Sequence, residues 1–207
     1  DGYVHTNPLG DGNFLGDCVD DAEFIQCNNK LIGVRSYDMI PDVFSEIIPG
    51  WPAIGEDYQG HGSHVASTAA GNVVKNVPLV TVGAGDQSDG MVIKEDLFPE
   101  ISGVAPHAKI ISYQVCYPSN DIGANGCPGE ILLAGIEDAI SDGVDVINFS
   151  IGGSDSNSWT DPVQLAFLAA REAGINVAAA AGNSGQGCGS AECFGYLDNS
   201  SPWLAQV

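Results

Sequence analysis

Basic residues are scarce in this chain. Its 207 residues include 6 Lys and Arg against 27 Asp and Glu, which gives a formal net charge of -21 at pH 7. A charge of this sign repels the phosphates of nucleic acids and the headgroups of anionic membranes, so we expect neither as a partner. We interpret the acidic residues as a solvated surface that keeps the protein in solution.

Long apolar runs are also missing. No stretch approaches the roughly 18 apolar residues that a membrane-spanning helix requires. Hydrophobic residues nevertheless make up 44% of the sequence. That content is enough for a single globular domain with a sizeable core.

Cysteine motifs typical of metal sites do not occur. There is no Cys-x-x-Cys, and no histidine lies at a matching spacing from the cysteines, which argues against a zinc site. Each pair of neighbouring cysteines instead encloses a stretch rich in Gly, Asn, Asp or Pro: Cys18 with Cys27, Cys116 with Cys127, and Cys188 with Cys193. We interpret these pairs as local disulfides, although sequence cannot choose among the connectivities. Disulfides indicate an oxidising compartment, so we expect a secreted or extracellular protein.

From residue 104 onward, strand and helix patterns alternate. Apolar and helical periodicities predict a strand over 109–116, a helix over 130–141, a strand over 144–151, a helix over 161–173 and a strand over 175–181. Asp161 is expected to cap the second helix, with Pro162 in its first turn and Gly174 at its end. Such alternation favours a largely parallel sheet covered by helices on both faces. The predicted fold class is therefore α/β.

The first hundred residues are less regular. Residues 1–30 are rich in Gly, Asn and Asp and are predicted to form an irregular, disulfide-closed loop. Residues 30–37 predict a short strand, and a helix is expected to begin near His61. Small residues in that helix would let other backbone approach it closely. Residues 73–103 are predicted to be an irregular surface insertion.

Two functional groups lie at the ends of predicted elements. His61 is at the start of a helix, and an imidazole that titrates near neutral pH can take a proton from a serine and return it to a leaving group. Asn183 follows the apolar strand over 175–181, where a fixed amide can donate a hydrogen bond to the oxyanion of a tetrahedral intermediate. These are two of the parts that an acyl-transfer enzyme needs.

Four short sequence blocks follow one another between residues 60 and 185. They are Gly60-His61-Gly62-Ser63-His64-Val65-Ala66, Gly103-Val104-Ala105-Pro106, residues 145–153 and Ala180-Ala181-Gly182-Asn183. In content and order they resemble the signature blocks of the subtilisin-like serine proteases, and Ser201-Pro202-Trp203 is similar to a further block of that family. The resemblance implies a three-layer subtilisin-like fold, incomplete at both ends, with residues 1–207 as a partial peptidase domain. Residues 28–33 and the cysteine loop before them are most similar to the larger secreted members.

The resemblance also implies the roles of individual residues. It assigns the general base of a serine endopeptidase to His61 and the oxyanion donor to Asn183. It implies that a polypeptide substrate binds as an added strand between two segments, which comprise Ser150, Ile151, Gly152 and Gly153 on one side and Ala180, Ala181 and Gly182 on the other. Their small side chains predict a roomy specificity pocket for apolar or aromatic groups. A propeptide or a protease-associated domain is an expected partner outside this segment.

The catalytic Asp and Ser are not evident in the sequence. The family order is Asp, His, Ser, so the carboxylate should precede His61. Asp38, after the strand predicted over 30–37, is the best local candidate. We expect instead that the Asp lies before Asp1 and that the Ser lies after Val207.

Two other interpretations compete with this one. A non-catalytic peptide-binding module that keeps this fold without a triad stays open. A metal site at His61 and His64 is disfavoured because the His-Glu-x-x-His pattern is absent, and His64 is predicted to be a packed structural residue. Hydrolysis by a triad requires no cofactor; the resemblance implies that calcium can bind, but no ligand set can be identified.

Residues 1–207 alone are expected not to hydrolyse peptides, because neither the nucleophile nor the orienting carboxylate is identified in them. The purified segment should leave a chromogenic peptide uncleaved. Steady cleavage that a serine-directed phosphonate abolishes would refute this expectation.

Overall fold

The structure, a computed structural model, divides into two compact units. Unit 1 comprises Asp1–Arg35 and Ile54–Ser112, and unit 2 comprises Ser36–Ala53 and Tyr113–Val207. The residues that the structure describes are 2–20, 25–37, 55–57, 59–81, 91–116, 126–153, 157–183 and 197–207. Each unit is described by itself below.

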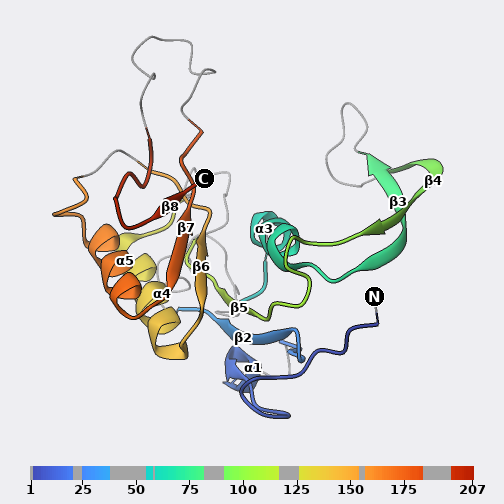
Figure 1. The fold of residues 1–207 in the computed structure, drawn as a ribbon, viewed down its shortest axis with the longest axis horizontal. Coiled ribbons are helices and arrows are strands. Elements are labelled where there is room, and N and C mark those ends of the chain that lie inside the picture. The colour runs from blue at the N-terminus through green and yellow to red at the C-terminus, as the bar shows by residue number, and fades with distance from the viewer. Residues whose placement is uncertain are drawn as a thin grey trace, which may run out of the picture. The chain divides into compact units, whose positions relative to one another are not determined.

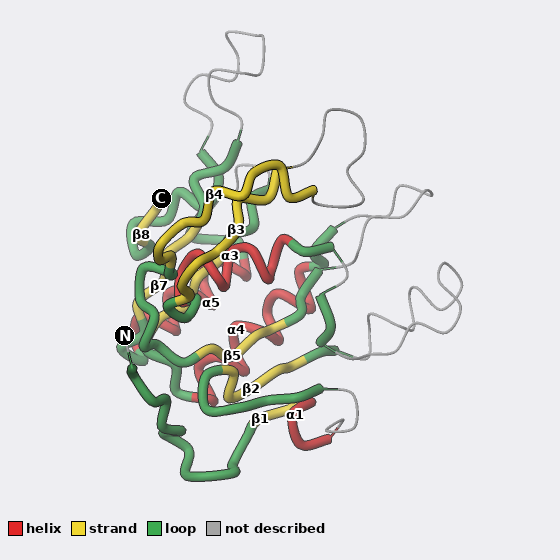
Figure 2. The backbone as a smooth tube through the Cα atoms, turned by 90° about the vertical axis from the view of Figure 1, so that its right-hand side faces the viewer, coloured by secondary structure: helices red, strands yellow, loops and turns green. Residues whose placement is uncertain are grey.

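Unit 1 contains a small sheet of three strands. β1 (Leu15–Gly16) pairs in parallel with β2 (Leu31–Arg35), and β2 lies between β1 and β5 (Ile110–Tyr113). Figure 2 shows the three strands side by side. The strand predicted over 30–37 is confirmed. The loop predicted over 1–30 contains β1 and the single turn α1 (Asp17–Asp20), which are too short to leave a periodic signal in the sequence.

A two-stranded antiparallel ladder is the second feature of unit 1. β3 (Val74–Thr81) pairs with β4 (Met91–Ile101), as Figure 1 shows. The prediction of an irregular segment over 73–103 is therefore wrong. Pro78 cannot donate a ladder hydrogen bond, the register shifts between Pro78 and Val80, and Asn76 has a φ of 54°. These irregularities disrupt the alternation by which a strand is recognised in a sequence.

α3 (His61–Ala70) is the longer of the two helices described in unit 1, and a loop contacts its C-terminal end. The last carbonyls of a helix lack partners within the helix. Here the backbone N–H groups of 103–105 donate to the carbonyls of Gly71, Thr68 and Ala69 at 2.9, 3.0 and 2.8 Å. The expectation that small side chains in this helix let other backbone approach is thus confirmed.

Unit 2 is a parallel sheet with helices packed on it. The strand order is β6 (Val146–Phe149), β7 (Asn176–Ala179), β8 (Ala205–Gln206), and both pairs are parallel. α4 (Gly129–Asp142) precedes β6, and α5 (Pro162–Glu172) connects β6 to β7. Asp161 caps α5, since its Oδ1 accepts a hydrogen bond from the backbone N–H of Gln164 at 3.0 Å. The α/β class and the predicted order of strands and helices are confirmed.

The core of unit 2 lies between the helices and the sheet. Phe167 of α5 is fully buried, and its ring meets that of Phe149 edge to face at a centroid distance of 4.9 Å. Val177 on β7 is also buried there. Both α4 and α5 lie on this side of the sheet (Figure 1). In the described part of unit 2 the opposite face is open, and Val146 is 56% exposed.

Gly103→Ala is expected to destabilise unit 1, because a Cβ at this position would overlap the backbone of Ser67 and Gly71. Forcing extra atoms into such a contact costs about 1–3 kcal/mol, measurable as a lower midpoint in chemical denaturation. Gly62→Ala is the matched control: its Cβ would meet only Asp57 Oδ2, at an ordinary 3.5 Å. Equal stability of the two variants would contradict the account of this helix end.

Candidate functional site

A pocket lies where β6 and β7 end in unit 2. Its volume is about 380 Å³, and it is lined by Ser150, Gly152, Gly153, Ala180, Ala181, Gly182, Asn183, Asp198 and Val207. We call it the strand-end pocket. The structure thus places all the predicted substrate-binding residues except Ile151 around one cavity, together with Asn183. Ile151 packs against the core instead.

A buried polar network holds the two walls of this pocket together. The side-chain amide of Asn199 donates to the carbonyl of Ile151 at 2.8 Å and to that of Ala180 at 3.0 Å. Its Oδ1 accepts a hydrogen bond from Gln164 Nε2 at 3.0 Å, and Ser201 Oγ donates to Gln164 Oε1 at 2.5 Å. Gln164 and Ser201 are buried. The ends of β6 and β7 are therefore fixed relative to each other through side chains of α5 and of the segment before β8.

Asp198 is a pocket residue that the sequence analysis missed. Its carboxylate lies against Gly152 and Gly182, so close that a Cβ on either glycine would overlap it. Its backbone N–H donates to the carbonyl of Ala181 at 3.0 Å, and its own carbonyl accepts from Gln206 Nε2 at 2.7 Å. No motif marks Asp198 in the sequence; the only signal is its place directly before Asn199.

Asn183 lies at the end of the wall that continues from β7. Its side chain is exposed, and the preceding Gly182 has a φ of 90°, in the left-handed region that favours glycine. An exposed amide that lines a pocket can donate a hydrogen bond to a bound ligand.

His61 is the first residue of α3, and the turn before it is held by Asp57. Asp57 Oδ1 accepts hydrogen bonds from the backbone N–H groups of Gln59 and Gly60 at 3.1 and 2.7 Å, and Oδ2 accepts from that of Ser63 at 2.7 Å. The His61 side chain is exposed. Sequence analysis did not identify Asp57, although an Asp shortly before a helix start is a known capping signal.

These hydrogen bonds determine the charge state of Asp57. Partial burial raises the pKa of its carboxyl group, but the hydrogen bonds from Ser63, Gly60 and Gln59 outweigh burial and hold the pKa below its usual range. The turn that positions His61 therefore depends on an ionised carboxylate.

Other predicted residues have mixed outcomes. The disulfides Cys18–Cys27 and Cys116–Cys127 are confirmed. Cys188, Cys193 and Asp38 lie outside the described residues. His64 is exposed, so the prediction that it is packed is wrong.

The described residues contain no helix that is both long and apolar enough to cross a membrane.

The sequence matches a model described as the Subtilase family over residues 44–205. It is 33% identical over 193 residues to "Subtilisin-like protease SBT4.15" of Arabidopsis thaliana, covering 93% of this chain and 21% of that protein. It is 35% identical over 199 residues to the "CO(2)-response secreted protease" of the same species, covering 93% of this chain and 22% of that protein. The chain thus spans about a fifth of the length of these relatives.

Solved structures also match part of the chain. The epidermin leader peptide processing serine protease of Staphylococcus aureus is 28% identical, with a TM-score of 0.34, over 41% of this chain and 22% of that protein.

Asp57→Ala is expected to loosen the start of α3. Loss of a helix cap costs about 0.5–2 kcal/mol, and hydrogen exchange of the Gly60 and Ser63 amides should accelerate, while the amides of α5 provide an internal control. Because the pKa of Asp57 is lowered in the folded state, its contribution is complete above the pKa of an unfolded Asp, about 3.9. It is lost as the pH falls through the lower folded pKa. Unchanged exchange in Asp57→Ala would contradict this role.

Proposed function

This chain belongs to the subtilase family, and we propose that it supplies the general base, the oxyanion donor and the substrate-binding segments of a serine endopeptidase. The strand-end pocket carries the proposal. Two glycine-rich segments and an exposed amide line one cavity at the carboxyl ends of parallel strands. That edge of an α/β sheet is where ligands bind in such folds.

The substrate is proposed to be a polypeptide in extended conformation. Gly152 and Gly153 on one wall and Gly182 on the other carry no side chain that would keep a peptide from their backbone. An extended peptide can then bind along the walls by main-chain hydrogen bonds, as an added strand does. Side chains of alternate residues would project into the pocket.

The catalytic step assigned to this chain is proton transfer and charge stabilisation. His61 is proposed to take the proton of the nucleophilic serine and to return it to the leaving amine, since an imidazole can do both near neutral pH. Asn183 is proposed to donate its side-chain amide to the oxyanion that forms on the scissile carbonyl. This chain covers only 21% of the length of one relative. The Asp and Ser of the triad are proposed to lie in the parts of the full-length protein that correspond to the rest of that relative.

An extracellular location is part of the same proposal. The two disulfides form stably in an oxidising compartment, and one relative is named a secreted protease. Hydrolysis by these groups is proposed to need no cofactor. Binding of calcium, of a propeptide or of a protease-associated domain is left as a proposal without assigned residues.

Substitution of His61 and Asn183 in the full-length protein tests the assignment. His61→Ala should abolish turnover of a peptide substrate, because no other group takes the serine proton. Asn183→Ala should lower kcat by about 10²–10³-fold with KM nearly unchanged, the range that applies to the oxyanion donor of subtilisin itself.

His107→Ala is the control, because it removes another exposed imidazole of unit 1. Full activity of both His61→Ala and Asn183→Ala would refute the assignment. A full-length protein that binds peptides without any turnover would indicate the non-catalytic peptide-binding module instead.

A further inference from the structure

We propose that Asp198 makes the strand-end pocket selective for a basic side chain, Lys or Arg, of the bound peptide. This inference rests on the proposed function, because it takes the ligand of the pocket to be a peptide. It adds a substrate class that the small walls alone do not specify: they would suit apolar or aromatic groups equally well.

The position of the carboxylate is the first observation. Asp198 contributes its side chain between Gly152 on one wall and Gly182 on the other. It is the only charged residue among the described residues that line the pocket. A side chain that enters between the two walls therefore meets a carboxylate.

The carboxylate is fixed in place but has no partner within the part of the chain that the structure describes. The backbone of Asp198 is held on both sides, by Ala181 and by Gln206, and the next residue, Asn199, bridges the two walls. Among the described residues none donates a hydrogen bond to the Asp198 carboxylate or forms an ion pair with it. A half-buried carboxylate without a donor binds an ammonium or guanidinium group by short, charge-assisted hydrogen bonds.

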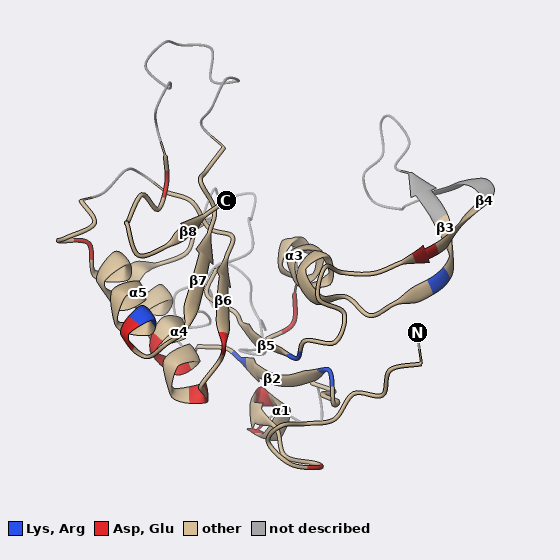
Figure 3. Cartoon of the chain, viewed as in Figure 1, with Lys and Arg blue, Asp and Glu red and all other residues tan. Residues whose placement is uncertain are grey.

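The charge of unit 2 favours the same class of ligand. Arg171, in the last turn of α5, is its only Lys or Arg residue; Figure 3 colours Lys and Arg blue, including one segment of α5. The guanidinium of Arg171 already donates to the carbonyl of Ile175 and to Asn176 Oδ1. Within the described part of unit 2, no cation is thus placed to neutralise Asp198. The formal net charge of -21 also attracts cationic peptides from solution.

An apolar or aromatic occupant is disfavoured by the same geometry. It would cover the Asp198 carboxylate and remove water from it without offering a hydrogen bond, which carries a large free-energy cost for a charged group. A Lys or Arg side chain places its apolar stem along the glycine and alanine walls and its charge at the carboxylate.

Matched peptides can test the selectivity in the full-length protein. The peptides are identical except at one position, which carries Lys, norleucine or Gln, and this position is moved along the peptide from one series to the next. Norleucine has the stem of Lys without its amino group. At one position we expect kcat/KM for Lys to exceed that for norleucine by roughly 10- to 100-fold, as for a hydrogen bond between charged groups. This preference should decrease as ionic strength rises.

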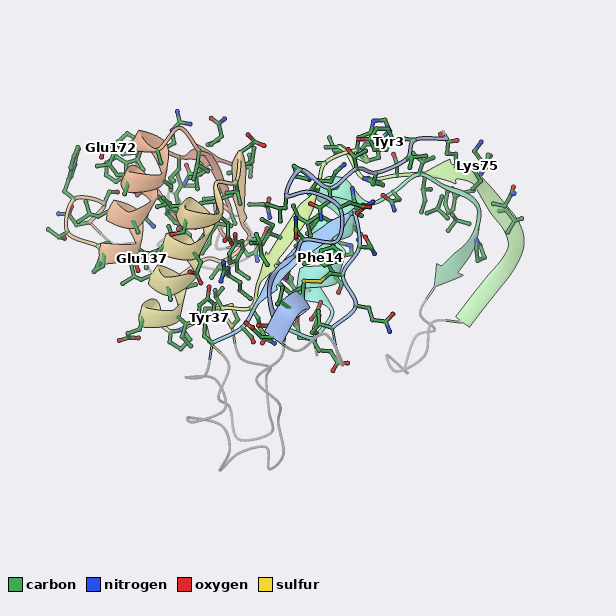
Figure 4. The ribbon with its side chains drawn as sticks, turned by 90° about the horizontal axis from the view of Figure 1, so that it is seen from below. Tyr3, Phe14, Tyr37, Lys75, Glu137 and Glu172 are labelled. Atoms are coloured by element: carbon green, nitrogen blue, oxygen red, sulfur yellow. A yellow bond between two sulfur atoms is a disulfide. The ribbon has the colours of Figure 1, made fainter. Side chains whose placement is uncertain are left out.

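Two variants locate the effect. Asp198→Asn should remove the preference for Lys while cleavage of the norleucine peptide is retained. Glu137→Gln removes one negative charge from an exposed position on α4, labelled in Figure 4, and should keep the preference. Should Asp198→Asn fail to fold, the preference of the unaltered protein and its salt dependence decide the matter.

The outcomes separate this inference from the proposed function. Cleavage of all three peptides without a preference for Lys at any position would overturn the acidic pocket and leave the endopeptidase intact. If no peptide is cleaved, calorimetry on the same proteins measures how tightly each of them binds the peptides. Tighter binding of the Lys peptide that Asp198→Asn abolishes would support the acidic pocket although hydrolysis has failed, and equal binding would overturn both.

Discussion

The geometry of the strand-end pocket depends on one side-chain amide, that of Asn199. It donates to carbonyls at the ends of two neighbouring strands, and its oxygen is held by a buried glutamine of the helix beneath. Carbonyls at strand ends have no ladder partner and would otherwise need water. By satisfying two of them with one group, the network sets the separation of the walls and also the position of Asp198, the residue before it.

In α3, the helix that carries His61, the backbone groups at the two ends are likewise satisfied by other groups of the protein. An isolated helix of this length is marginal in water, and its ends are its weakest points. In unit 1 the entry turn is held by the Asp57 carboxylate, and the final carbonyls are held by the backbone of residues 103–105. The sequence blocks around His61 and Gly103, which are separated by a long hairpin, therefore form one structural element.

How much of the structure could be predicted from the sequence depends on how close in the sequence the residues lie that form each feature. Helices and strands after residue 104 were predictable because apolar periodicity and the Asp161 cap are local. The β3–β4 ladder was missed because Pro78 and a register shift break the alternation that identifies strands. Asp198 was missed for another reason: it lies against Gly152 and Gly182, which are distant in the sequence and come close only in the fold. Asp57, by contrast, carries a local signal that was overlooked, because its partners are backbone groups of the residues that follow it.

The pocket also shows how glycine and charge depend on each other. A carboxylate fits between the walls only because Gly152 and Gly182 lack a Cβ; an alanine at either position would displace it. Among the described residues no donor or counter-ion meets this carboxylate, so its charge adds no ion pair to the stability of the fold. Such a group stabilises the protein only when a ligand brings the opposite charge. The proposed selection of a basic side chain therefore accounts for Asp198 better than a role in folding does. Gly152 and Gly182 belong to the same arrangement, because they leave room for the carboxylate.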